Sequence, residues 1–73
     1  MHQRRKPNQI ARVYTRHYRD NDSLRAYVEW GDGSRTEGKA EIYHGGRVPV
    51  GAHMGALFDR ALRDGLSVTH ETW

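Results

Sequence analysis

The chain has 73 residues, with 12 Lys or Arg, 9 Asp or Glu and no Cys, and its formal net charge is +3. This length predicts one small domain with a thin core, and the lack of cysteine excludes a disulfide framework and a thiolate metal site. No apolar run approaches the roughly 18 residues that a membrane-spanning helix needs, so we expect no membrane partner.

The charge is distributed unevenly along the chain. Residues 1–19 carry six basic side chains and no acidic one, whereas residues 20–73 carry six basic and nine acidic ones. This separation predicts a binding module whose partner is anionic or carries charges of both signs. Residues 1–9 are expected to form a flexible basic arm that steers association by charge. The basic residues of this arm are Arg4, Arg5 and Lys6.

Three segments in the first two thirds of the chain alternate apolar and polar side chains, which is typical of strands. We expect these strands at residues 10–18, 24–30 and 35–44, with turns between them where Asp, Asn, Gly and Ser cluster. Gly38 inside the third strand is expected to mark a bulge, and residues 45–51 are expected to be a loop. The side chains expected on the core face are Val13, Ala26, Val28, Trp30, Ala40 and Ile42.

Residues 52–64 are predicted to form the one helix. Their apolar side chains recur at helical spacing, on a stripe made of Met54, Leu57, Phe58, Ala61 and Leu62. Gly55 costs roughly 1 kcal/mol against Ala inside a helix, which indicates close packing on the sheet. Gly65 is the expected C-terminal cap. Residues 66–73 are predicted to be a last strand.

These elements predict an α+β domain over residues 10–73. The expected architecture is a small antiparallel sheet of three to four strands with one helix packed on one face, in the order β-β-β-α-β. The helix has the only apolar stripe in the sequence, so it must cover one face of the sheet. The other face is expected to be open to solvent.

Aromatic and basic side chains alternate on the face expected to be open. The first two strands would place there Ile10, Arg12, Tyr14, Arg16, Tyr18 and Tyr27. Such rings stack on bases, and guanidinium groups pair with phosphates, so a single-stranded nucleic-acid-binding module is one interpretation. Tyr and Arg are also favoured anchors of protein interfaces. An ordinary solvated sheet face is a third interpretation.

Acidic residues on the same face favour a protein partner over nucleic acid. Glu29, Glu37 and Glu41 alternate with the basic residues and would repel a phosphate backbone. We therefore take Arg12, Tyr14, Arg16, Tyr18 and Tyr27, with the basic arm, as the candidate partner-binding residues.

No motif in the sequence supplies a catalytic or cofactor site, and we expect a non-enzymatic protein with no metal, cofactor or small-molecule substrate. The 5 histidines lack the helical i, i+4 spacing and the Cys/His clustering of metal ligands. Residues 20–22 begin like a calcium loop but lack the later Gly and Glu at the required offsets. Gly45-Gly46 is not followed by the Lys-Ser/Thr pair of a phosphate-binding loop.

As a whole, the chain resembles the small phage-encoded regulators of bacterial RNA polymerase. The resemblance rests on its length, its Arg/Gly-rich composition and its basic segment 1–19. It implies a protein that binds host RNA polymerase, inhibits initiation by interfering with sigma factor, and causes antitermination. It also implies contact near the RNA exit channel, with the basic arm close to nucleic acid.

The resemblance leaves other partners open. An inhibitor of a different host protein, of the anti-defence type, would have the same features in its sequence. We expect a monomer when the protein is free and a location in the bacterial cytoplasm, which the lack of cysteine fits.

Overall fold

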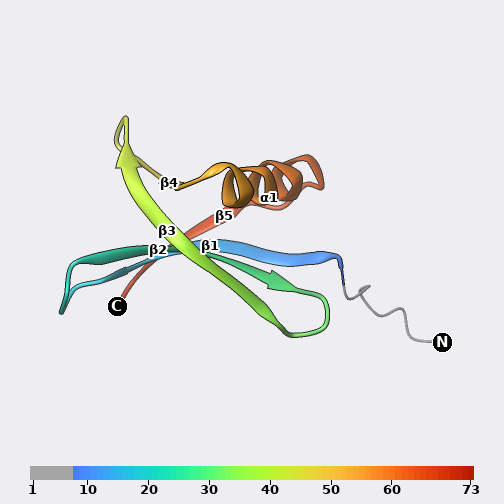
Figure 1. The fold of residues 1–73 in the computed structure, drawn as a ribbon, viewed down its shortest axis with the longest axis horizontal. Helices are drawn as coiled ribbons and strands as arrows, with labels where there is room; N and C mark the ends of the chain where they lie inside the picture. Colours follow the sequence, from blue (N-terminus) through green and yellow to red (C-terminus); the bar gives the residue numbers. More distant parts are fainter. Residues whose placement is uncertain (1–7) are drawn as a thin grey trace.

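The computed structural model describes residues 8–73, which form one five-stranded sheet and one helix (Figure 1). The strands lie in the order β4-β3-β2-β1-β5, and α1 carries the chain from one edge of the sheet to the other. The predicted α+β class, with one helix on a small sheet, is confirmed. The elements are β1 (Ile10–Tyr18), β2 (Ser23–Trp30), β3 (Arg35–Tyr43), β4 (Gly46–Pro49), α1 (Ala52–Arg63) and β5 (Val68–Thr72).

The sheet is mixed, because its last strand pairs in parallel. β1 to β4 form an antiparallel meander, but β5 lies parallel to β1, with Val13 opposite Val68 and His17 opposite Thr72. β4 and α1 both run opposite to β1 (Figure 1). The chain reverses once more at Gly65, so β5 runs in the same direction as β1.

The sequence predicts a loop at residues 45–51, but Gly46–Pro49 form the edge strand β4. β4 pairs antiparallel with the second half of β3. The two residues between these strands, His44 and Gly45, have positive φ angles of 51° and 77°, as a tight type I′ hairpin turn requires. Pro49 is tolerated because an edge strand makes ladder hydrogen bonds on one side only.

A bulge in β1 moves Ile10 to the opposite face from the predicted one. Ile10 pairs with Trp30 and Arg12 with Glu29, so β1 has one more residue than β2 over this stretch. The extra residue shifts the alternation, since successive side chains otherwise point to opposite faces. Ile10 is consequently buried in the hydrophobic core.

The core lies on the face of the sheet toward α1, called the inner face below. The predicted core side chains buried there are Val13, Ala26, Val28 and Ala40. Trp30 is partly buried against them, and its indole N–H donates to the hydroxyl of Thr36 at 2.8 Å.

α1 covers only part of the inner face (Figure 1). Its 12 residues are about 18 Å long, whereas the 9 residues of β3 extend about 30 Å. Ile42, near the end of β3, lies beyond the helix and is 63% exposed. Its predicted place in the core is therefore wrong: the alternation assigned it to the correct face, but nothing covers that end of the face.

The predicted apolar stripe of α1 is wider than its contact with the sheet. Met54, Phe58 and Ala61 are buried and Leu57 is partly buried. Leu62 is 52% exposed, so its predicted place in the core is wrong. It lies on the flank of the helix, beside a shallow hollow next to β4.

The predicted cap at the end of α1 is confirmed. Gly65 has a φ of 89°, a conformation that glycine adopts without a steric penalty. The N–H groups of Gly65 and Leu66 donate to the carbonyl groups of Leu62 and Ala61, both at 3.0 Å. This pair of bonds is a Schellman motif, which ends the helix and turns the chain toward β5.

Two glycines differ in how closely other atoms approach them. A Cβ added to Gly38 would lie 2.7 Å from Met54 Cγ, and the pairing of Gly38 with Ala26 continues without interruption. Gly38 thus allows α1 to approach the sheet closely. The predicted bulge at Gly38 is wrong, because the strand pairing is not interrupted there. A Cβ added to Gly55 meets no atom within 4 Å, so the predicted close packing of Gly55 is wrong too.

We expect Gly38→Ala to lower the free energy of unfolding by about 1–2 kcal/mol, because Met54 must move. Gly55→Ala is the matched control and should raise the free energy of unfolding by about 1 kcal/mol, because Ala is the better helix former. Urea unfolding curves of the two variants and the wild type measure both changes. A Gly38→Ala variant as stable as the wild type would contradict the close approach.

Candidate partner-binding surface

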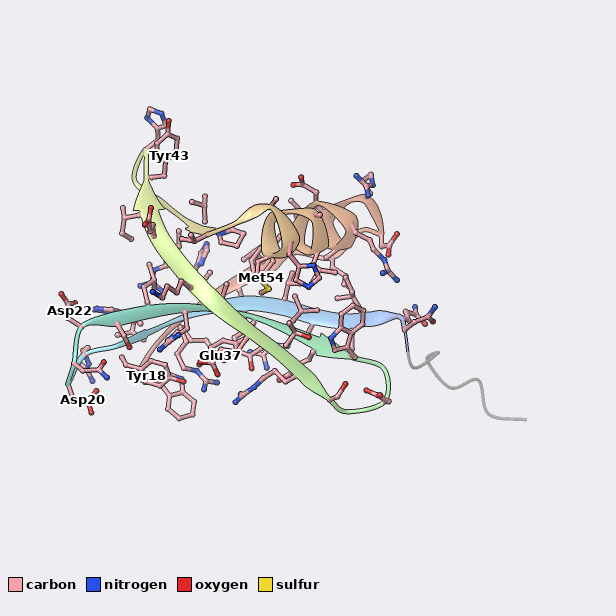
Figure 2. All side chains as sticks on the ribbon, in the orientation of Figure 1. Tyr18, Asp20, Asp22, Glu37, Tyr43 and Met54 are labelled. Atoms are coloured by element: carbon pink, nitrogen blue, oxygen red, sulfur yellow. The ribbon has the colours of Figure 1, made fainter. Side chains whose placement is uncertain are left out.

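The face of the sheet opposite α1, called the outer face below, carries the described part of the predicted site (Figure 2). β1 and β2 bring together there Arg12, Tyr14, Arg16, Tyr18 and Tyr27. The predicted arm residues Arg4, Arg5 and Lys6 lie outside the described residues.

The two central tyrosines of the outer face are buried. Tyr14 is 1% and Tyr27 is 2% exposed, and their rings stack with centroids 5.0 Å apart. The guanidinium carbon of Arg12 lies 4.1 Å from the ring centroid of Tyr14, and that of Arg35 lies 4.6 Å from the ring centroid of Tyr27. The expectation that these rings are open for stacking is therefore wrong, because long arginine side chains lie over them.

Arg16 is at the centre of the aromatic and arginine side chains that cover the outer face. Its guanidinium carbon lies 3.8 Å from the Trp73 ring, its Nη1 donates to the Tyr18 hydroxyl at 3.1 Å, and its Nε donates to Glu71 at 3.0 Å. Burial alone would lower the pKa of Arg16, but the hydrogen bonds to Tyr18 and Glu71 outweigh burial and raise the pKa above its usual value. We define the Arg16 cluster as Arg12, Tyr14, Arg16, Tyr18, Tyr27, Arg35, Glu71 and Trp73.

Glu71 supplies the negative charge of the Arg16 cluster, and the sequence analysis missed it. Its carboxylate accepts hydrogen bonds from Arg16 and Arg12. Burial raises the pKa of Glu71, but these two bonds outweigh burial and hold the pKa below the usual 4.5. The contribution to stability is therefore present above the usual pKa and is lost as the pH falls through the lowered value. Only the parallel pairing of β5 with β1 places Glu71 opposite Arg16.

Tyr18 and Tyr27 share a hydrogen bond of 2.7 Å between their hydroxyl groups. The bond to Tyr27, together with the bond from Arg16, lowers the pKa of Tyr18. Burial, together with the bond to Tyr18, raises the pKa of Tyr27 from 10.0 to about 12. Because folding raises the pKa of Tyr27, its contribution to stability is present below pH 10 and is lost as the pH rises toward 12.

We expect the urea midpoint of the wild type to fall between pH 10 and about 12, as Tyr27 ionises. Tyr27→Phe has no hydroxyl at this position and should lose much less stability over the same range. Urea unfolding measures the midpoint at each pH, and near-ultraviolet absorbance follows tyrosine ionisation. Equal alkaline losses in the two proteins would contradict the assignment to Tyr27.

Exposed apolar side chains gather on the β3–β4 hairpin. Three of them, each at least 38% exposed, lie on one face of the hairpin and form what we call the hairpin surface: Tyr43, Val48 and Val50. Ile42 is exposed on the opposite face. Tyr43 lies next to the tip of the hairpin, far from α1 (Figure 2). Sequence analysis missed this surface because Val48 and Val50 lie in the predicted loop. The Val-Pro-Val run in that segment was the signal that could have found it.

A cleft lies between the ends of the two hairpins. It has a volume of about 700 Å³ and is lined by His17, Asp22, Leu24, Ala40, Glu41, Ile42 and Arg47. Arg47 connects the two edges of the sheet, since it donates to the carbonyl of Glu71 at 2.9 Å and to the hydroxyl of Thr72 at 3.4 Å. The sheet therefore curls around the part of the inner face that α1 leaves uncovered.

Other kinds of site find no support in the described residues. No group of three or more His, Cys, Asp or Glu side chains that could hold a metal ion occurs within residues 8–73. The helix in this part of the chain is too short and too polar to cross a membrane. No family model, curated protein or solved structure matches the chain.

Proposed function

We propose that this chain is a non-enzymatic protein-binding module that contacts its partner through the hairpin surface. The observation that supports this proposal is the exposure of three apolar side chains on one face of a single hairpin. Adjacent exposed apolar side chains mark interaction sites, and tyrosine is a frequent anchor of protein interfaces. A chain with only 36% hydrophobic residues has few apolar side chains for its core. The placement of exposed apolar side chains on a projecting hairpin therefore favours a role in binding rather than in folding.

Bacterial RNA polymerase is the partner that we propose. The resemblance to small phage-encoded regulators supports this choice, as does the basic segment 1–19, which suits a partner that carries nucleic acid. In this proposal the module occupies a polymerase surface that sigma factor or a terminator hairpin needs, which inhibits initiation and causes antitermination. The bacterial cytoplasm is the location that goes with this partner. An inhibitor of another host protein would use the same surface and is the alternative.

A single-stranded nucleic-acid-binding module is less well supported. Tyr14 and Tyr27, which would stack on bases, are buried. The guanidinium groups beside them are engaged: Arg16 with Glu71, Arg25 with Glu37 at 3.7 Å, and Arg35 with the Tyr14 hydroxyl at 3.3 Å. Few rings or unpaired cations on the outer face are therefore free for a nucleic acid.

The test is a pull-down from bacterial lysate with the tagged full chain, with and without nuclease, read by mass spectrometry. We expect RNA polymerase subunits in both samples. Capture that nuclease abolishes would assign the binding to nucleic acid. A different partner that resists nuclease would exclude polymerase and leave the protein-binding proposal in place.

The contact surface is tested with a double variant, Tyr43→Ser with Val48→Ser. Hot-spot residues contribute about 2 kcal/mol or more, so we expect at least tenfold weaker binding to purified polymerase. The matched control is His53→Ala with Arg63→Ala, two exposed positions on α1, which should bind like the wild type. Equal loss in both double variants would exclude the hairpin surface as the contact.

A further inference from the structure

We propose that the cleft between the two hairpins binds an extended segment of the partner protein, in which an apolar side chain is adjacent to a Lys or Arg. This inference rests on the proposed protein-binding function and adds the chemistry that the partner must present. Three features of the cleft carry it: an apolar floor whose outer end α1 does not reach, an acidic rim, and a volume that suits a short segment.

The floor of the cleft is apolar, and Ile42 at its outer end is uncovered. Leu24 and Ala40 belong to the inner face, and Ile42 continues that face two residues further along β3. α1 packs over the other half of the face, where Met54 and Phe58 are buried. An apolar side chain of the partner can therefore occupy the space over Ile42 that a longer helix would have filled. Its binding would bury both that side chain and Ile42.

The rim of the cleft attracts a cation. The side chain of Asp22 is 90% exposed, and its one described bond is to His17, at 2.6 Å. Glu41 is exposed on the opposite rim and has no ion pair within residues 8–73. Arg47, the one arginine or lysine of the lining, donates to groups of β5 instead.

Asp20 lies in the same β1–β2 turn as Asp22 but is not part of the lining of the cleft (Figure 2). Arg47 bonds neutral groups of β5 and keeps its own charge, so the lining holds two carboxylates, those of Asp22 and Glu41, against one guanidinium. A Lys or Arg of the partner would therefore be attracted to this rim by the carboxylate in excess.

The dimensions fit a short extended segment. About 700 Å³ holds more than one side chain and lies within the range of known ligand sites. In an extended chain, adjacent side chains point in opposite directions. The apolar side chain would then point to the floor at Ile42, while its neighbour points out and bends to Glu41 or Asp22 at the rim.

The test uses the peptide acetyl-Gly-Leu-Lys-Gly-amide, titrated into the full chain labelled with ¹⁵N and followed by amide chemical shifts. We expect a dissociation constant of about 1 mM, with shifts concentrated in residues 17–24 and 40–47. Replacing Leu by Ser or Lys by Glu in the peptide should weaken binding at least fivefold. The proposal would be overturned if neither replacement weakened binding, or if the chemical shift changes lay outside residues 17–24 and 40–47.

Protein variants provide the reciprocal test. Ile42→Ser, and the pair Asp22→Asn with Glu41→Gln, should each weaken peptide binding at least fivefold. Leu62→Ser removes a comparably exposed apolar side chain outside the cleft and should leave peptide binding unchanged. Unchanged binding in the cleft variants would overturn the proposal. Shifts in the cleft that grow with protein concentration alone would assign it to a second copy, which also overturns it.

The failures of the two proposals are distinguishable. If the lysate partner is captured equally by the wild type and Ile42→Ser, and the peptide does not bind, the cleft proposal fails while the protein-binding function stands. If no protein partner is captured at all, the proposed function fails. Peptide titration would then still decide whether the cleft has the stated chemistry.

Discussion

We expect Arg16→Ala to lower the free energy of unfolding by about 3 kcal/mol. The side chain of Arg16 is 11% exposed and bonded to Glu71, which keeps its negative charge when the arginine is removed. Breaking a largely buried charge pair in this way costs several kcal/mol, because Glu71 is left with Arg12 as its one remaining cationic partner in the described residues. The contacts of the guanidinium with the Trp73 and Tyr rings are lost at the same time.

Arg25→Ala is the matched control for this prediction. Arg25 lies on the same face, but its side chain is 39% exposed and 3.7 Å from Glu37. An exposed pair of this kind contributes little, so we expect a change of about 0.5 kcal/mol or less. Urea unfolding at neutral pH measures both variants. Equal and small losses in the two variants would show that the Arg16 cluster does not stabilise the fold.

We expect Phe58→Ala to lower the free energy of unfolding by about 3–4 kcal/mol. Phe58 is 4% exposed and lies where α1 packs on the inner face. Removing a buried aromatic ring loses its transfer free energy and leaves a cavity. A domain of this size has a total stability of roughly 4–11 kcal/mol, so this loss removes between about a third and nearly all of it.

Leu62→Ala is the matched control on the same helix. The sequence predicts both residues on one apolar stripe, but Leu62 is 52% exposed. We therefore expect its substitution to cost less than about 1 kcal/mol. Circular dichroism on heating compares the two variants directly. Similar losses for Phe58 and Leu62 would mean that α1 packs in a different orientation.

The domain has an apolar core on one side of its sheet and a polar aromatic layer on the other. A chain of 73 residues buries only a modest fraction of its surface on folding. Here the buried tyrosines of the outer face increase that buried area. The hydroxyl of Tyr14 donates to Glu29 at 3.0 Å, and those of Tyr18 and Tyr27 bond each other, so burial leaves these polar atoms with partners. The outer face therefore stabilises the fold, which moves the candidate contact to the hairpin surface and the cleft.

The sequence by itself determined five of the six elements, all except β4, and the faces of the central strands. Alternation in residues 10–18 and 24–30 placed Val13 and Tyr14 on opposite faces correctly, and the Gly65 cap ended the helix as predicted. These features depend on neighbours in the chain, so local spacing is enough to find them. The alternation of apolar and polar residues did not predict the bulge at Ile10, because a bulge depends on the partner strand.

Tertiary structure decided which side chains are buried and which are exposed. Tyr14 is buried because arginines from two strands lie over it and β5 supplies Glu71. Ile42 is exposed because α1 is shorter than β3. Periodicity determines the direction in which a side chain points, but burial depends on what packs against it, and that comes from segments far away in the chain.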